Sequence, residues 1–154
     1  MILGTRVDGE ASCVASSYIS MAKMLSRQRN DMHIKYPIPS LPVALIAGGE
    51  TVVTLPQNCI GKGGQNQELA LSAAMKMQEI GLQDVVLACV GADGTDGSTD
   101  SAGAIVYGGI VNKDTINDAK DALKNHDAYS FLERTKSLMI SCKITGLLNA
   151  KRCL

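Results

Sequence analysis

Two stretches of the chain carry residue types that could bind a phosphate group or the metal ion that accompanies it. The first is a glycine-rich turn, Gly61-Lys62-Gly63-Gly64, directly before a helical pattern. Glycines let a backbone approach a ligand closely, and free N–H groups at the start of a helix attract negative charge. A phosphate cradle and a plain glycine-rich turn both fit this stretch, because it lacks the spacing of the known nucleotide-binding glycine motifs.

The second stretch is an acidic loop with three aspartates, Asp93, Asp96 and Asp100, at intervals of three and four residues. It follows an apolar strand pattern at 85–90, and ligands of open α/β sheets gather at the carboxyl ends of strands. Carboxylates with neighbouring hydroxyls suit Mg²⁺, which prefers oxygen ligands and shared phosphate oxygens. The alternative is that the Asp-Gly pairs only form tight turns.

Two further positions could contribute an acid or a base. Glu50 follows a glycine pair at a predicted strand end, where it fits either the same cleft or a solvated surface position. His126 beside Asp127 fits a base with its orienting acid. The pattern favours the alternative, in which His126 ends one helix and Asp127 caps the next.

The elements that must position these residues alternate between strands and helices, which predicts an α/β fold with a mixed, mostly parallel sheet. The strand patterns lie at 2–7, 43–47, 51–55, 85–90, 104–107 and 137–142. The helix patterns lie at 10–28, 66–80, 114–124 and 127–134. We expect Asn66 to cap the second helix and Gly81 to follow its end. Residues 30–42 contain three prolines and form the best candidate for a connector.

The composition limits the classes of function. Apolar residues make up 45% of the chain and charged residues 19%, which excludes a disordered protein. A formal net charge of +0 argues against a nucleic-acid partner. The five cysteines are scattered and odd in number, which indicates reduced thiols of a cytoplasmic protein rather than disulfides or a zinc site. No segment reads as a secretory signal or approaches the ~20 apolar residues of a membrane span.

Three ordered motifs identify a family. They are GGET at 48–51, GKGGQNQELAL at 61–71 and GTDGSTDSAGA at 94–104. Over about residues 42–134 they resemble the C-terminal MOFRL domain of class II glycerate kinases, also called hydroxypyruvate reductases. The resemblance divides the chain into a leading strand and helix, 1–36, and a MOFRL-like domain, 37–154, with a divergent tail from about 135.

The resemblance also implies an activity. Family members transfer the γ-phosphoryl group of ATP to D-glycerate, with Mg²⁺, in a cleft shared with a larger N-terminal α/β domain. ATP and Mg²⁺ are therefore the expected cofactors, and a missing N-terminal domain or partner chain is an expected partner. The strand pattern so close to the first residue likewise suggests a fragment of a larger protein.

The motifs and the resemblance together assign site residues. Catalytic roles go to Lys62, Gln65 and Asp96, and metal binding goes to Asp93, Asp96 and Asp100. Substrate or phosphate binding is assigned to Gly48, Gly49, Glu50, Gly61, Gly63, Gly64, Asn66, Gly94, Thr95 and Gly97.

Two departures from the family pattern lower the expected activity. Gln65 stands where family members usually have arginine, and glutamine cannot neutralise an oxyanion or grip it with two charged bonds. The family's closing glycine-rich motif is replaced here by residues 145–149. We expect little activity from the chain alone, and a non-catalytic isoform that binds nucleotide or a partner is the alternative. An oxidoreductase is disfavoured, because the chain lacks the dinucleotide-binding glycine motif.

Overall fold

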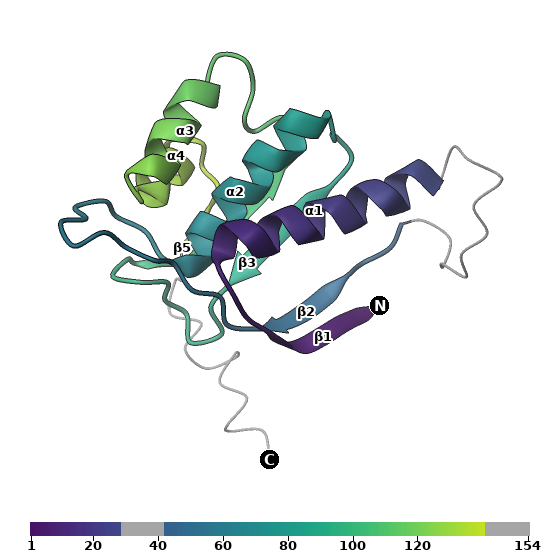
Figure 1. Ribbon diagram of the computed structural model, residues 1–154, viewed down its shortest axis with the longest axis horizontal. Coiled ribbons are helices and arrows are strands. Elements are labelled where there is room, and N and C mark those ends of the chain that lie inside the picture. Colours follow the sequence, from purple (N-terminus) through teal and green to yellow (C-terminus); the bar gives the residue numbers. More distant parts are fainter. Residues whose placement is uncertain (29–41, 141–154) are drawn as a thin grey trace.

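The computed structural model describes residues 1–28 and 42–140, in which helices lie against two small sheets (Figure 1). The strands are β1 (Ile2–Val7), β2 (Ile46–Gly49), β3 (Val86–Val90), β4 (Ser101–Tyr107) and β5 (Leu138–Ile140). The helices are α1 (Ala11–Gln28), α2 (Gln65–Ile80), α3 (Ile116–Lys124) and α4 (Ala128–Arg134). This mixture of strands and helices confirms the predicted α/β class.

The prediction that the sheet is mostly parallel is wrong. β1 and β2 pair in parallel, but β3, β4 and β5 form an antiparallel sheet. The reason lies in the acidic loop, which joins β3 to β4 without a helix, whereas a parallel pair needs a longer crossover connection. The predicted strand at 51–55 is also wrong, because only an isolated bridge between Glu10 and Val52 forms there.

Helix α2 is the centre of the fold. It lies against β3 and β4 on one side and contacts α1, α3 and α4 on the others. Of its predicted inward positions, Leu69, Ala73 and Met77 are buried and Ile80 is partly buried. Neighbouring alanines allow the other elements to approach closely. The helix ends at Gly81, whose left-handed backbone (φ 67°) confirms the predicted C-terminal glycine. Helix α2 therefore covers β3 and β4, and all of its residues except Glu79 are buried or half-buried.

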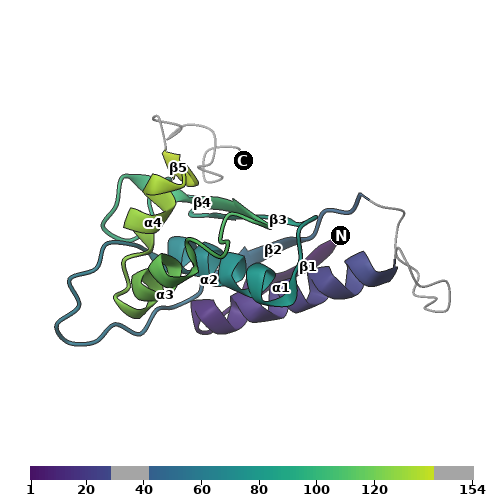
Figure 2. The ribbon, with the colours of Figure 1, turned by 90° about the horizontal axis from the view of Figure 1, so that it is seen from above.

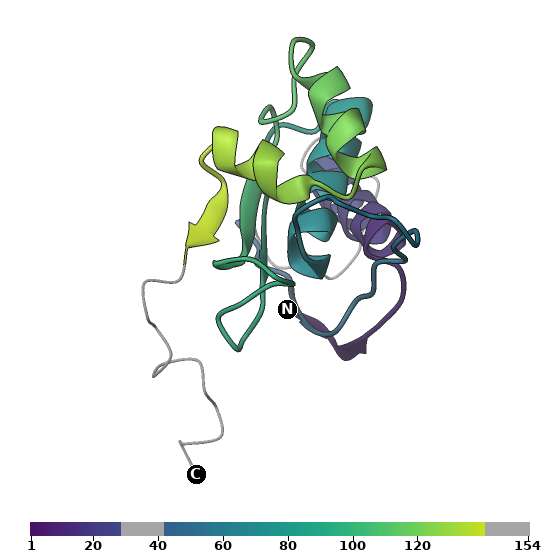
Figure 3. The same cartoon turned by 90° about the vertical axis from the view of Figure 1, so that its left-hand side faces the viewer.

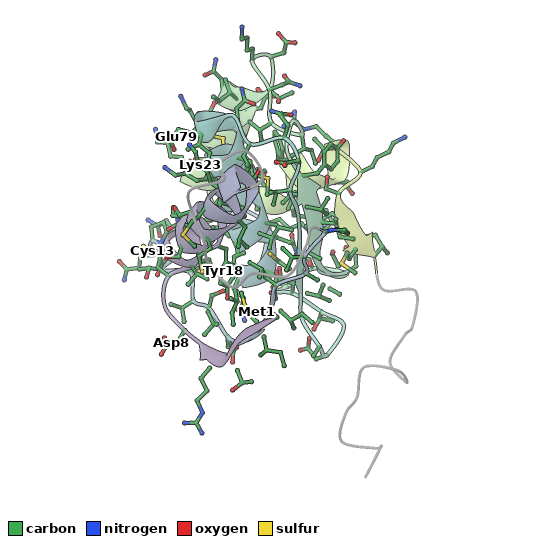
Figure 4. The ribbon with its side chains drawn as sticks, turned by 90° about the vertical axis from the view of Figure 1, so that its right-hand side faces the viewer. Met1, Asp8, Cys13, Tyr18, Lys23 and Glu79 are labelled. Atoms are coloured by element: carbon green, nitrogen blue, oxygen red, sulfur yellow. The ribbon has the colours of Figure 1, made fainter. Side chains whose placement is uncertain are left out.

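Helix α1 packs on α2 and extends the helical layer, which lies on one side of β3 and β4 (Figure 2). The Lys23 ammonium reaches the last turn of α2 and donates to the Ile80 carbonyl at 3.5 Å. In Figure 4, Lys23 lies near Glu79 of α2, and the exposed Cys13 lies further along α1. Within the described part of the chain, no helix is long and apolar enough to cross a membrane.

The C-terminal elements close the other end of the helical layer. Helices α3 and α4 pack against each other and against α2, and the chain then turns into β5 at the edge of the antiparallel sheet (Figure 3). Most of the predicted connector at 30–42, and the divergent residues 145–149, lie outside the described residues. The division into residues 1–36 and 37–154 stays a prediction.

Candidate functional site at the end of an open groove

The start of α2 is capped by a side chain from the acidic loop. Gly64 occupies the N-cap position and has no side chain to accept a hydrogen bond. The Asp96 carboxylate fills that role, since the backbone N–H groups of Asn66 and Gln67 donate to it at 3.0 and 2.8 Å. The Asn66 side-chain amide donates to the same carboxylate at 3.0 Å. Asp96 is only 2% exposed, so this cap is part of the interior.

The predicted anion site at the start of α2 is therefore filled by the protein's own carboxylate. The N–H groups and dipole of a helix start stabilise a negative charge, and Asp96 supplies that charge. An external phosphate could not use the N–H groups of Asn66 and Gln67 while Asp96 holds them. The prediction that Asn66 caps the helix is wrong, because Asn66 lies within the first turn.

The contact between the glycine turn and the acidic loop predicts a large effect of a small substitution. A Cβ atom at Gly64 would collide with the carboxyl and backbone carbons of Asp96. We expect Gly64→Ala to lower the free energy of unfolding by about 2 kcal/mol, as overpacking of a tight interior does. Urea denaturation measures the effect.

Gly4→Ala is the matched control for that substitution, because a Cβ atom at Gly4 would meet nothing within 4 Å. The control should leave the free energy of unfolding within about 0.5 kcal/mol of the unaltered chain. Equal stability of the two variants would show that the glycine turn and Asp96 are not in close contact.

A long open groove runs between β2 and β3, with side chains of α1 and α2 along it. One end of the groove joins residues from all three sequence motifs. Nine of the predicted site residues line the groove: Gly48, Gly49, Glu50, Gln65, Asn66, Asp93, Thr95, Asp96 and Gly97. The Gln65 side-chain amide donates to the Glu50 carboxylate at 3.2 Å, which ties the first two motifs together. We call these nine residues the groove end.

The charged side chains that line the groove end are all acidic. Glu50 and Asp93 are exposed, and no lysine or arginine of the described residues lines any part of the groove. Like charges repel, so a bare polyphosphate would be disfavoured beside these carboxylates. The groove end can accept hydrogen bonds from a hydroxyl group, and it can receive a phosphate only together with a cation.

Lys62, predicted as catalytic, does not line the groove. Its ammonium lies 3.5 Å from the centroid of the Tyr129 ring, and the Tyr129 hydroxyl donates to Asp100 at 2.7 Å. This hydrogen bond lowers the pKa of Asp100 and is the main cause that raises the pKa of Tyr129 to about 12. The structure therefore splits the predicted site into the groove end and a second cluster of Lys62, Tyr129 and Asp100.

The three predicted metal ligands do not converge on one point. Asp96 is committed to the cap of α2, Asp100 to Tyr129, and one oxygen of Asp93 accepts the Thr95 N–H at 3.2 Å. Among the described residues, no group of three or more His, Cys, Asp or Glu side chains could hold a metal ion. A metal site built from these three aspartates is thus not formed by the described part of the chain.

His126 pairs with Glu68 rather than with its neighbour Asp127. The His126 Nδ1 atom lies 3.1 and 3.2 Å from the two carboxylate oxygens of Glu68 in α2. Asp127 instead accepts the Lys62 N–H at 3.1 Å and the Ser130 hydroxyl at 2.8 Å, at the start of α4. A base with its orienting acid is therefore not formed by His126 and Asp127, and both residues support neighbouring segments.

The comparisons with known proteins decide the family. The family model described as "MOFRL family" matches residues 43–147. The chain belongs to the MOFRL family. It is 48% identical over 102 residues to the D-glycerate 2-kinase of Thermotoga maritima, covering 65% of this chain and 24% of that protein. It is 41% identical over 97 residues to the glycerate kinase of Mus musculus, covering 60% of this chain and 18% of that protein.

Solved structures agree with this membership. A crystal structure of glycerate kinase from Thermotoga maritima superposes with a TM-score of 0.76 at 39% identity, covering 92% of this chain and 32% of that chain. A protein from Pyrococcus horikoshii superposes with a TM-score of 0.71 at 33% identity, covering 91% and 30%. The MOFRL chain described here thus spans about a third or less of the length of these relatives.

Sequence reasoning missed two residues that organise the site of this MOFRL chain. Tyr129 joins the glycine turn to the acidic loop, and Glu68 holds His126. Tyr129 lies in a helical pattern outside the three motifs and Glu68 lies inside the second one, but nothing in their spacing indicates contacts across the fold. The sequence motifs contain only the two partners of Tyr129, Lys62 in the glycine turn and Asp100 in the acidic loop.

Burial of a thiol in the MOFRL core predicts a dependence of stability on pH. Burial, with a smaller effect of Asp96, raises the pKa of Cys89 from 9.0 to about 12. Because the protonated thiol is favoured in the folded state, its contribution is complete below pH 9 and is lost as the pH rises toward 12. Between pH 9 and 10.5 we expect the free energy of unfolding to fall more steeply than in Cys89→Ala, by up to about 1.4 kcal/mol per pH unit.

Cys13→Ala is the control for this measurement, because Cys13 is free and exposed. Its slope against pH, measured by urea denaturation, should match that of the unaltered chain. A Cys89→Ala variant with an unchanged slope would contradict the predicted role of the buried thiol.

Proposed function

We propose that the groove end is a glycerate-kinase-type surface for phosphoryl transfer from ATP to a hydroxyl group of D-glycerate. The observation that carries this proposal is the meeting of Glu50, Gln65, Asp93 and Thr95 at one end of the groove. Glu50, Gln65 and Thr95 come from the three sequence motifs, Asp93 directly precedes the third, and the relative at 48% identity is named a D-glycerate 2-kinase. The activity, its substrates and its partners are proposals for this chain.

The acidic character of the groove end supports ATP bound as its Mg²⁺ complex. Mg²⁺ neutralises charge on the transferring phosphoryl group when it is bound. Glu50 and Asp93 are exposed carboxylates in the same lining and have the oxygen donors that Mg²⁺ prefers. Two carboxylates form an incomplete set, so we assign most of the remaining coordination to the phosphates of the nucleotide and to water.

The residues of this chain would act mainly by positioning. Glu50 can accept a hydrogen bond from a substrate hydroxyl, and the Thr95 hydroxyl can donate to a phosphate or carboxylate oxygen. Gln65 is held by Glu50 and can donate but carries no charge. Phosphoryl transfer depends on positioning and on charge compensation, and the second requirement is poorly met here.

This charge deficit supports a second candidate function, a binding module without turnover. No lysine or arginine of the described residues lines the groove, and Lys62 is engaged with Tyr129. The acceptor-rich groove end can still hold ATP·Mg²⁺ in the absence of catalysis. We therefore expect the chain to bind ATP·Mg²⁺ even where it transfers little or no phosphoryl group to D-glycerate.

Two measurements on the purified chain test these proposals. Calorimetric titration with ATP·Mg²⁺ should show binding, and a coupled assay of ADP release with D-glycerate should show little or no sustained turnover. Sustained turnover would establish the kinase and exclude the module without catalysis. Absence of both binding and turnover would overturn both functions for the chain by itself.

A further inference from the structure

Tyr129 lies outside the groove but contacts two of the segments that adjoin the groove end, the glycine turn at Lys62 and the acidic loop at Asp100. Its backbone N–H donates to the Lys62 carbonyl at 3.0 Å, and its ring lies under the Lys62 ammonium at 3.5 Å. Its hydroxyl donates to the Asp100 carboxylate at 2.7 Å. One buried side chain thus joins the glycine turn, which leads into Gln65, to the acidic loop, which carries Asp93.

The hydrogen bond from the Tyr129 hydroxyl to Asp100 contributes more than the packing of the ring. Burying a hydroxyl costs free energy unless it finds a partner, and hydrogen bonds to ionised acceptors are about twice as strong as neutral ones. The Asp100 carboxylate is exposed and is attached to the fold at this point by Tyr129. The hydroxyl therefore has one specific function that phenylalanine, with the same ring, could not fulfil.

Three contacts hold the acidic loop against helices α2 and α4. Asp96 makes the first one from the interior, through the N–H groups of Asn66 and Gln67. The Gln67 side-chain amide makes the second one, by donating to the Thr99 hydroxyl at 2.8 Å. The contact of Asp100 with Tyr129 of α4 makes the third one, four residues beyond Asp96. Contacts with both α2 and α4 fix the orientation of the loop as well as its position, and this loop carries Asp93 and Thr95 of the groove end.

We propose that Tyr129 is a positioning residue of the groove end and that Asp100 serves as its hydrogen-bond acceptor rather than as a metal ligand. The binding part of this inference rests on the proposed function, because its probe is ATP·Mg²⁺. The structural part needs no ligand and can be tested separately.

Three variants and one control distinguish an acceptor from a metal ligand. Tyr129→Phe removes the hydroxyl, and Asp100→Ala removes its acceptor. Asp100→Asn removes the charge but keeps an oxygen that can accept the hydrogen bond. Tyr107→Phe is the matched control, because Tyr107 is an exposed tyrosine of β4 that is 53% exposed and outside the groove lining.

Calorimetric titration with ATP·Mg²⁺ gives the first readout. We expect Tyr129→Phe and Asp100→Ala to weaken binding by similar factors of about three to ten, which is less than the full loss of a hydrogen bond to a charged group because Tyr129 acts on the groove end indirectly. The double variant should be no weaker than either single one. Asp100→Asn should weaken binding less than Asp100→Ala, because it keeps a neutral hydrogen bond, and the Tyr107→Phe control should stay within about twofold of the unaltered chain.

The opposite pattern would overturn the inference. If Asp100 is a metal ligand, Asp100→Asn should weaken binding as much as Asp100→Ala, while Tyr129→Phe leaves it unchanged. Additive losses in the double variant would likewise show that the two residues act separately.

Amide hydrogen exchange of the ligand-free chain gives the second readout. Tyr129→Phe and Asp100→Ala should each accelerate exchange in the acidic loop, residues 91–100, by about three- to tenfold, and Asp100→Asn should accelerate it less, because it keeps a neutral hydrogen bond. Unchanged exchange in Tyr129→Phe would contradict the attachment itself. If the unaltered chain binds no ATP·Mg²⁺, the proposed nucleotide site fails, and the exchange rates still decide the role of Tyr129.

Discussion

Replacing Asp96 with alanine is expected to lower the free energy of unfolding by about 3 kcal/mol, because two first-turn N–H groups of α2 lose their charged acceptor in a buried place. Those donors belong to Asn66 and Gln67, and Asp96 is almost fully buried. The helix dipole adds to the loss, since the carboxylate lies at its positive end. Urea denaturation followed by circular dichroism measures the change.

Two further variants keep this prediction testable. Asp96→Asn retains one acceptor oxygen and should cost about 1.5 kcal/mol, so it can be measured even if the alanine variant does not fold. Asp93→Ala is the control, because Asp93 is exposed and accepts a single local hydrogen bond from Thr95. Its cost should stay below about 1 kcal/mol. A cost for Asp96→Ala no larger than that of Asp93→Ala would show that the cap contributes little.

Gln65→Arg is the substitution with the largest expected effect on binding. It would place the first positive charge among the described residues that line the groove, beside the Glu50 carboxylate. An arginine can grip a phosphate or carboxylate with two charged hydrogen bonds, which the glutamine amide cannot do. We expect ATP·Mg²⁺ and D-glycerate each to bind about tenfold more tightly, which corresponds to about 1.4 kcal/mol. Calorimetric titration with each ligand measures the affinity.

The geometry of the new side chain, and not only its charge, should matter. Gln65→Lys adds the same charge without the planar fork and should give less than half of the gain in binding free energy. Gln65→Met removes the donor at similar size and should weaken binding slightly. An arginine variant that binds both ligands no more tightly than the unaltered chain would show that the groove end does not receive the anionic groups.

Local patterns determined most of the helices and strands of this chain. Apolar spacing located α1 and α2 nearly to the residue, and Gly81 ended α2 as expected because only glycine takes a left-handed backbone cheaply. The direction of strand pairing was not in those patterns. Whether β4 pairs with β3 in antiparallel or parallel direction depends on the connection between them. The acidic loop is too short for a parallel crossover, so the pair is antiparallel.

The sequence by itself determined the family and the α/β class, because ordered motifs and the apolar spacing of helices and strands are local features of a sequence. Only the tertiary structure decided what each side chain does. It placed Asp96 on the start of α2, Glu50 on Gln65, and Tyr129 between Lys62 and Asp100. A carboxylate in a loop has the same signature whether it faces a metal ion, a helix start or a phenol. Its partner is set by packing between segments about thirty residues apart, and no spacing along the chain encodes that contact.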